Sequence, residues 1–326
     1  MMRRAGWVTL VALAATALAG CAASTEGDGG EPAASDGPAR FAIDADFPDP
    51  DVLTLDDGYV AFATGTHGLN VQVATSPDLE EWTVQRRDAL PKLPAWASPG
   101  RTWAPEVSAG PDGGLIMYVT AEDTASGRQC IGVATSPSVE EPFVAASDVP
   151  IVCPVDAGGA IDASTFDAAD GTRYLLWKTD GNCCSLPTWI EMAPLSADGL
   201  SLAGDPMRLI QQDLDWEGTL VEAPVLVEHD GRFALFSSAN DYGGEDYAVG
   251  VAYADALTGP YVKQPEPLLT TQLSDGTLRG PGGQDVVHTP DGDRIVFHSW
   301  DEQFIYRGLN VRPLEWTADG AKVVLD

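Results

Sequence analysis

Three acidic residues occupy matching places in a repeated pattern of this sequence. Asp49, Asp162 and Glu222 each lie eight residues before an Asp-Gly pair. Carboxyl groups that converge repel one another and lose hydration, and both effects favour the protonated form of at least one. Glycosidic cleavage needs such a pair, because one acid protonates the leaving oxygen while an ionised carboxylate activates water or attacks carbon. The three acids therefore predict acid–base chemistry if the fold brings them together.

The elements that must position these acids follow from a five-fold repeat. The Asp-Gly pairs recur at intervals of 55 to 61 residues, at Asp57-Gly58, Asp112-Gly113, Asp170-Gly171, Asp230-Gly231 and Asp291-Gly292. A short apolar or alternating run follows each pair, which is typical of antiparallel strands joined by tight hairpins. Helical periodicity is nearly absent after residue 40. Five units of three to four strands predict an all-β fold, a five-bladed β-propeller over residues 41–326.

The propeller also predicts where the acids lie. The first strand of each blade lines the central channel, so residues at equivalent places in the five first strands should ring one mouth. Counting eight residues back from each pair gives Asp49, Ala104, Asp162, Glu222 and Gly283. The alternative interpretation is that these acids only cap strands or solvate the mouth of a very acidic protein.

Charge excludes some partners of the chain. Its 326 residues include 18 Lys and Arg against 49 Asp and Glu, for a formal net charge of −31. This excess repels polyanions at long range, so neither nucleic acid nor anionic lipid is expected as a partner. The hydrophobic fraction of 44 % is that of an ordinary globular protein. We also expect the protein to be a monomer.

The first 40 residues predict export. Arg3 and Arg4 precede an apolar stretch over residues 7–19 that is too short to span a bilayer, so residues 1–20 are predicted to be a signal peptide. The segment Leu18-Ala19-Gly20-Cys21 resembles the lipobox of bacterial lipoproteins, which implies cleavage before Cys21 and its acylation. Residues 21–40 are predicted to be a flexible tether, giving a membrane-anchored lipoprotein that faces outward. The alternative is an ordinary signal peptide with a stray Cys.

Four further cysteines remain in the body of the chain. An exported protein meets an oxidising environment, which favours disulfides, but four cysteines allow three pairings and the sequence does not choose among them. No His or Cys cluster has the spacing of zinc ligands, so no metal site is predicted. The residues are Cys130, Cys153, Cys183 and Cys184.

The segments around the acids resemble glycoside hydrolase family 43, the five-bladed arabinan- and xylan-active hydrolases. The matching segments are 47–52 (FPDPDV), 103–107 (WAPEV), 160–164 (AIDAS) and 221–224 (VEAP), and the resemblance covers residues 46 to about 316. It implies that Asp49 is the general base, that Glu222 is the general acid, and that Asp162 raises the pKa of the general acid and orients it. It also implies a single displacement with inversion, for which the base and acid carboxyls stand roughly 6.5–9.5 Å apart.

The resemblance further implies the substrate class. We expect hydrolysis of α-L-arabinofuranosyl linkages in arabinan or arabinoxylan, with β-xylosides or other furanosides as the alternative within the family. No cofactor is required. A second alternative, from a different class, is a non-catalytic carbohydrate-binding propeller, which would keep the aromatic residues but could lose an acid.

One position departs from the family pattern. Family members commonly carry a His at the fifth anchor, where it helps to bind a central ion or water, whereas Gly283 stands there in this chain. This departure argues against a channel ion such as calcium. His288 and His298 follow in the fifth blade, and we interpret them as buried or edge histidines rather than ligands.

Four residues beside the mouth are candidate sugar contacts. Phe47 and Trp103 flank the anchors, where an aromatic face could stack on a sugar, and the alternative is packing between blades. Arg279 and Gln284 lie near the fifth anchor and could bind hydroxyl groups, and the alternative is a role at the surface or at a strand end.

Overall fold

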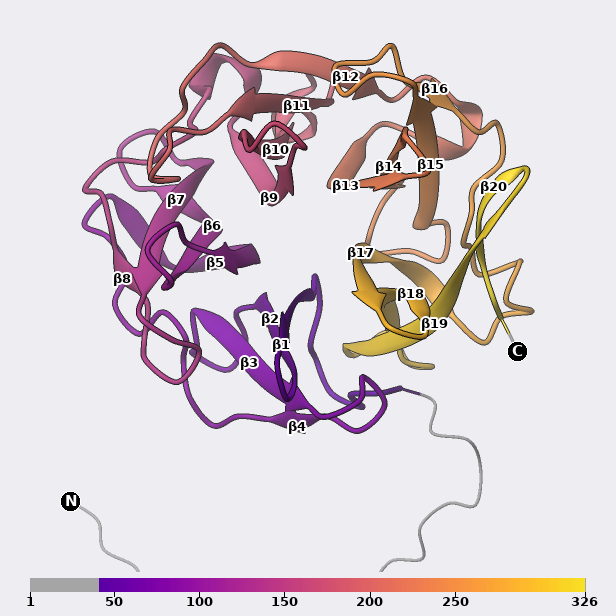
Figure 1. Ribbon diagram of the computed structural model, residues 1–326, viewed down its shortest axis with the longest axis horizontal. Coiled ribbons are helices and arrows are strands. Elements are labelled where there is room, and N and C mark those ends of the chain that lie inside the picture. Colours follow the sequence, from indigo (N-terminus) through magenta and orange to yellow (C-terminus); the bar gives the residue numbers. More distant parts are fainter. Residues whose placement is uncertain (1–40, 326) are drawn as a thin grey trace, which may run out of the picture. The chain divides into compact units, whose positions relative to one another are not determined.

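The computed structural model describes residues 41–325, which form five four-stranded antiparallel sheets arranged around a central axis (Figure 1). Within each sheet the strands follow one another in chain order, and β1, β5, β9, β13 and β17 are the innermost strands of the five blades. The predicted five-bladed β-propeller is therefore confirmed. The predicted signal peptide (residues 1–20) and tether (residues 21–40) lie outside the described residues. Within residues 41–325, no helix has the length and apolar character needed to cross a membrane.

The strand bounds follow blade by blade. The first blade holds β1 (Asp51–Leu55), β2 (Gly58–Thr64), β3 (Val71–Ser76) and β4 (Thr83–Val84). The second holds β5 (Ala97–Ala109), β6 (Leu115–Asp123), β7 (Arg128–Ser136) and β8 (Val144–Ala145). The third holds β9 (Ala160–Asp167), β10 (Arg173–Thr179), β11 (Trp189–Pro194) and β12 (Met207–Gln211).

The last two blades have the same plan. The fourth holds β13 (Val221–His229), β14 (Arg232–Ala239), β15 (Ala248–Ala254) and β16 (Val262–Lys263). The fifth holds β17 (Arg279–Thr289), β18 (Gly292–Trp300), β19 (Arg307–Thr317) and β20 (Gly320–Val323). Three short 3₁₀ helices lie in the loops around the third blade, namely η1 (Val155–Ala157), η2 (Gly181–Cys184) and η3 (Asp215–Glu217).

The hydrophobic core is divided among the contacts between neighbouring blades. The second strand of each blade is buried on both faces, which explains its near-continuous run of apolar residues, such as YVAFAT in β2. Phe62 of β2, for example, packs with Met117 of β6 and meets Phe143 edge to face. Similar clusters join the other blades, so packing between sheets fixes how their inner ends converge on the axis.

The ring closes where the segment before the first blade pairs with the fifth blade. The Ala42 N–H donates to the carbonyl of Leu309 on β19 at 2.8 Å, and the Leu309 N–H donates to the carbonyl of Ile43 at 3.1 Å. The Phe47 N–H then donates to the carbonyl of Arg307 at 2.9 Å. These bonds join segments far apart in the sequence, and they end two residues before Asp49.

The innermost strands share an irregularity near the channel mouth. In every blade an equivalent residue, within the innermost strand or two residues before it in the first blade, adopts a positive φ between 39° and 56°, and a register shift accompanies it in β5, β9, β13 and β17. A positive φ is uncommon outside glycine, so its recurrence marks structurally equivalent places. The residues are Asp49, Ala104, Asp162, Ala223 and Gly283.

This row corrects one of the five predicted anchors. Ala223, rather than Glu222, is the equivalent of Asp49 and Asp162 in the fourth blade. The reason is that the Asp-Gly pairs do not occupy equivalent turn positions. In the fourth blade the pair is the whole turn between His229 and Arg232, whereas in the first blade Gly58 already belongs to β2. A constant offset from the pair therefore misses the equivalent residue by one.

Candidate active site

All three predicted acids line a single cavity of about 540 Å³. Every blade contributes to its wall, and the predicted convergence of Asp49, Asp162 and Glu222 is observed. The other lining residues are Thr64, Trp103, Ile161, Lys178, Asp180, Asn182, Cys183, Thr219, Leu220, Asp241, Tyr242, Tyr247 and Arg307. The cavity therefore combines buried charge with aromatic surface, as a site for a polar, hydroxyl-rich ligand requires.

A row of hydrogen bonds holds the positive-φ residues in place. In four blades, the backbone N–H of this residue donates to a side chain on the second strand of the preceding blade, over 2.8 to 3.2 Å. The acceptor and donor residues are Thr64 and Ala104, Thr120 and Asp162, Ser238 and Gly283, and His298 and Asp49. This bond satisfies a backbone group that the bulge removes from the strand ladder.

The fourth blade breaks this row. The residue of β10 that corresponds to Thr64, Thr120, Ser238 and His298 is Lys178, which carries only donors and so cannot accept the bond. The Ala223 N–H donates instead to Oδ2 of Asp162 at 3.0 Å. The ammonium group of Lys178 points toward Glu222 instead. The Ala223 N–H, which Lys178 cannot accept, thereby holds the carboxyl group of Asp162 in place.

Asp49 lies in a setting that keeps it ionised. The Thr64 hydroxyl donates to its Oδ2 at 2.7 Å, and Nη1 of Arg307 lies 3.7 Å from its Oδ1. Burial acts to raise the pKa of this carboxyl, but the Arg307 guanidinium and then the Thr64 hydroxyl outweigh it, so the pKa lies well below its usual range. A carboxylate that remains charged can accept a proton from water.

His298 supports Asp49 from the fifth blade. Its ring is fully buried, and its Nδ1 accepts the Asp49 N–H at 3.1 Å, so the ring proton is on Nε2. Burial, followed by the charge of Arg307, lowers the pKa of this imidazole and keeps it neutral. His288, in contrast, has an exposed side chain that contacts Asp293. His298 therefore positions the backbone of a site residue, a contact that the sequence did not predict.

The packing of His298 explains the departure at Gly283. A Cβ on residue 283 would lie 2.6 Å from the His298 ring and 2.7 Å from Oδ1 of Asp49, so no side chain fits there. The residues present do not fit a channel ion either, because Nδ1 of His298 is engaged and Nε2 is protonated. Among the described residues, no group of three or more His, Cys, Asp or Glu side chains is placed to hold a metal ion.

Glu222 is held by two partners on different blades. Nζ of Lys178 lies 3.1 Å from its Oε2, and the hydroxyl of Tyr247 donates to its Oε1 at 2.7 Å. Lys178 also contacts Oδ1 of Asp180 at 3.3 Å. Burial acts to lower the pKa of the Lys178 ammonium, but the charges of Glu222 and Asp180 outweigh it and raise this pKa, so Lys178 stays charged. Both carboxylate oxygens of Glu222 are thus oriented.

Asp162 is disposed to carry a proton. Burial raises its pKa well above the usual range, and the nearby charge of Glu222 raises it further, against the opposing effect of Lys178. The contrast with Asp49 comes from their surroundings, since a guanidinium and a hydroxyl face Asp49 whereas another carboxylate faces Asp162. One site therefore holds carboxyl groups whose pKa values are pushed in opposite directions, the arrangement that acid–base chemistry uses.

A second group of acids lies deeper in the channel. A cavity of about 40 Å³ adjoins the first, because Asp49 and Asp162 line both, and it also contacts Asp51, Glu106 and Asp285. Burial raises the pKa of all three deeper acids, and that of Asp285 reaches about 7. Backbone N–H groups satisfy part of this cluster, since Val107 donates to Asp51 and Val52 donates to Asp285.

The four predicted sugar contacts have different placements. Trp103 lines the larger cavity. Phe47 is completely buried in the core between the fifth and first blades, which leaves no ring face for a sugar. Gln284 is buried as well, bonded to Ser238 and to the carbonyl of Ala223. Arg279 lies outside both cavities, where its guanidinium donates to the carbonyl of Glu302 and lies over the Phe304 ring.

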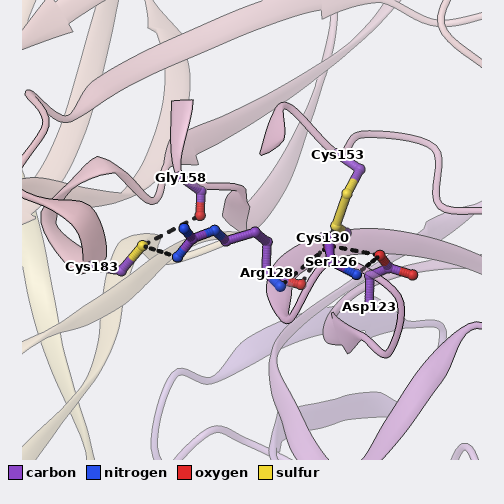
Figure 2. Close-up of a disulfide and its surroundings, with 7 residues drawn as sticks. All are labelled: Asp123, Ser126, Arg128, Cys130, Cys153, Gly158 and Cys183. Carbon is purple, nitrogen blue, oxygen red and sulfur yellow. Dashed lines mark hydrogen bonds between the residues drawn. A yellow bond between two sulfur atoms is a disulfide. The ribbon is translucent and has the colours of Figure 1, made fainter. Parts of the chain in front are cut away.

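The four cysteines of the propeller form two disulfides, and Figure 2 shows the one between Cys130 and Cys153 together with Cys183 of the other. Cys130 on β7 pairs with Cys153 in the loop before η1, and Cys183 pairs with its neighbour Cys184 in η2. Arg128 extends from β7 toward Cys183, with 3.5 Å between its Nη1 and the sulfur. Since Cys183 lines the larger cavity, the second disulfide is part of the site's rim.

Sequence reasoning did not assign a role to Lys178, Tyr247 or Arg307. Lys178 had a usable signal, because it follows Asp170 by eight residues where Thr120 and Ser238 follow their own Asp-Gly aspartates by the same distance. At this repeat position the fold requires a hydrogen-bond acceptor, so a lysine where other blades carry a hydroxyl residue is a recognisable exception. Tyr247 and Arg307 carry no such signal, since they lie just before or at the start of third strands and meet the acids only through the closed ring.

Comparison with known proteins agrees with this geometry. The family model described as "Glycosyl hydrolases family 43" matches residues 42–322. The chain is 27 % identical over 277 residues to the extracellular endo-alpha-(1->5)-L-arabinanase 1 of Bacillus subtilis (strain 168), covering 78 % of this chain and 80 % of that protein.

Solved structures give the same result. A thermostable family-43 glycoside hydrolase superposes with a TM-score of 0.76 at 29 % identity, covering 86 % of this chain and 93 % of that chain. An endo-1,4-beta-xylanase from Bacteroides thetaiotaomicron superposes with a TM-score of 0.73 at 27 % identity, covering 87 % and 96 %. Relatives named for arabinan and for xylan thus occur side by side.

Proposed function

Because the chain belongs to glycosyl hydrolase family 43 and is a glycosidase, we propose that it cleaves α-L-arabinofuranosyl linkages in arabinan or arabinoxylan with inversion. The observation that carries this proposal is the opposite disposition of Asp49 and Asp162 in one cavity, with Glu222 between a lysine and a tyrosine. The arabinanase relative from Bacillus subtilis supports the choice of sugar.

The proposed reaction is a single displacement. Ionised Asp49 accepts a proton from water as the water oxygen attacks the anomeric carbon. Protonated Glu222 gives its proton to the leaving oxygen, which takes the electron pair of the breaking C–O bond. Asp162 is proposed to orient the general acid, and the two buried carboxyl groups disfavour being ionised together. Trp103 is proposed to contact the sugar through its ring.

A substrate panel with product analysis tests this proposal. Linear and branched arabinan, arabinoxylan, xylan and galactofuranosides are incubated with the purified protein, and ¹H NMR identifies the anomer released first. We expect arabinose or arabino-oligosaccharides of inverted configuration. Asp49→Asn and Glu222→Gln should each lower turnover about 100-fold or more while leaving the circular dichroism spectrum unchanged.

Each other outcome rejects a defined part of the proposal. A retained anomer excludes the single displacement, and near-wild-type turnover of either variant excludes the role given to that residue. Products from xylan alone would favour the β-xylosidase alternative, which the xylanase-like structure also supports. Binding of the polysaccharides without any product would favour the non-catalytic alternative.

We also propose that the chain is exported and held to the membrane by a lipid on Cys21, with residues 21–40 as a tether to the catalytic propeller. The extracellular relative supports export, and the lipobox-like segment before Cys21 supports the anchor. In a bacterial host, the full chain should fractionate with membranes and the Cys21→Ser variant should not be acylated. Equal incorporation of labelled palmitate into both would contradict the anchor.

A further inference from the structure

Lys178 occupies a place where the fold requires a hydrogen-bond acceptor. Thr64, Thr120, Ser238 and His298 fill this place in the other blades, and each accepts the N–H of the next positive-φ residue. A lysine ammonium cannot do so. The fold tolerates Lys178 only because Asp162 supplies the missing acceptor to Ala223. A residue that cannot make a bond its fold position requires, and whose neighbour makes the bond instead, is expected at functional sites.

The ammonium of Lys178 is committed to the acid cluster. Its side chain is 1 % exposed, and its two ionic partners are Glu222 at 3.1 Å and Asp180 at 3.3 Å. Burying an ammonium is unfavourable unless anionic partners compensate, so Lys178 stays charged because of the carboxylates beside it. Lys178 is therefore placed to respond to the charge on Glu222.

Resting on the proposed role of Glu222, we propose that Lys178 is the positioning residue of the general acid. It holds one carboxyl oxygen in place and stabilises the carboxylate that forms as the proton leaves. In this step the O–H bond of Glu222 breaks, the proton binds the leaving oxygen, and the negative charge appears 3.1 Å from a fixed positive charge. No proton moves to or from Lys178.

The other groups around Glu222 define what Lys178 adds. Asp162 from β9, Asp180 after β10 and Asp49 before β1 are acids near the cluster, and the Tyr247 hydroxyl, from the residue before β15, donates one hydrogen bond to Glu222. His298 is neutral, and Arg307 from β19 is paired with Asp49. Lys178 is thus the cation in direct contact with Glu222 among the described residues.

The experiment compares Lys178→Met, Lys178→Thr and Lys178→Arg with wild type. Methionine keeps the length without the charge, and threonine is the residue that two other blades carry at this place. Both should shift the alkaline limb of the kcat/KM profile to higher pH by about one unit or more, because Glu222 keeps its proton longer without the cation. Arginine should leave the limb near its wild-type position.

Leaving groups give a second readout. Cleavage of an oligosaccharide needs protonation of a poor leaving group, so kcat should fall about 10- to 100-fold in Lys178→Met. A 4-nitrophenyl glycoside leaves without strong protonation, and its kcat should fall much less. Lys263→Met is the matched control, because Lys263 pairs with buried Glu217 at 2.6 Å away from both cavities. It should leave both readouts unchanged.

The outcomes separate this proposal from the proposed function. An unmoved alkaline limb together with equal losses on both leaving groups in Lys178→Met and Lys178→Thr would overturn the role of Lys178. Failure of wild type on every glycoside would overturn the function instead. In that case ¹³C NMR of the Glu222 carboxyl, assigned by its absence in Glu222→Gln, still decides, since its titration should move to higher pH in Lys178→Met.

Discussion

At the scale of single residues, the charge of the proposed base, Asp49, depends on a cation from another blade. Arg307 on β19 lies 3.7 Å from Asp49, and its charge is the strongest influence that lowers the pKa of this carboxyl against burial. Asp49 must be ionised to accept a proton from water. Asp49 therefore stays ionised because Arg307 lies beside it, and not because of the aspartate alone.

The Arg307→Met variant tests this dependence. Without the guanidinium the pKa of Asp49 rises, so Asp49 stays protonated to higher pH and the acid limb of the kcat/KM profile moves up. The profile is measured beside Arg279→Met, which removes a guanidinium outside both cavities. An acid limb that stays in place in Arg307→Met, or moves equally in both variants, would show that Arg307 does not set the charge of Asp49.

Residue types alone predicted only part of this site. Asp49, Asp162 and Glu222 could be singled out because each stands close to a repeated turn signal. Arg307 and Tyr247 could not, since a side chain at the start of a third strand, or just before one, reaches the acids only after the blades close around the axis. Phe47 lies beside the mouth in sequence, yet its side chain turns into the core between blades.

At the scale of elements, the innermost strands carry a double ring of acids. Below Asp49, Asp162 and Glu222, Asp285 of β17 accepts the N–H of Val52 at 2.9 Å, and this bond joins the fifth blade to the first. Its pKa is raised to about 7 by burial and then by the charge of Glu106. In the unfolded chain an aspartate ionises near pH 4.

This difference makes stability fall with pH. Between about pH 4 and 7, folded Asp285 keeps a proton that the unfolded chain releases, so raising pH through this window removes stability. The melting temperature of wild type should therefore drop more between pH 5 and 8 than that of Asp285→Asn. Asp255→Asn, which changes a highly exposed side chain, serves as the control. Parallel curves for wild type and Asp285→Asn would contradict the assignment.

The sequence repeat predicted the strands of the five blades, but it did not predict the exact residue at which each innermost strand bulges. Hairpin signals gave five blades in the observed order, because Asp-Gly turns and apolar runs are local features. The bulge that separates Glu222 from Ala223 depends on hydrogen bonds between blades, which no local pattern records. For the same reason, the sequence did not predict the row of hydrogen bonds to the positive-φ residues, in which Lys178 is the exception.

At the scale of the whole molecule, the ring is completed by noncovalent contacts between its first and last blades. The segment before β1 pairs with Leu309 and Arg307 of β19, and Val52 bonds to Asp285. A core of buried side chains including Ile43, Phe47 and Val296 supports this junction. The innermost strands therefore keep their convergence only while this junction holds.

The same junction makes the setting of Asp49 depend on completion of the whole ring. The described partners of the Asp49 carboxylate and N–H include His298 and Arg307, both from the opposite end of the sequence. A polypeptide that emerges from its amino end has Asp49 early but acquires these partners only when the last blade is complete. Nascent or partly opened chains therefore lack the charged setting of the proposed base, and we expect hydrolysis only from chains whose ring has closed.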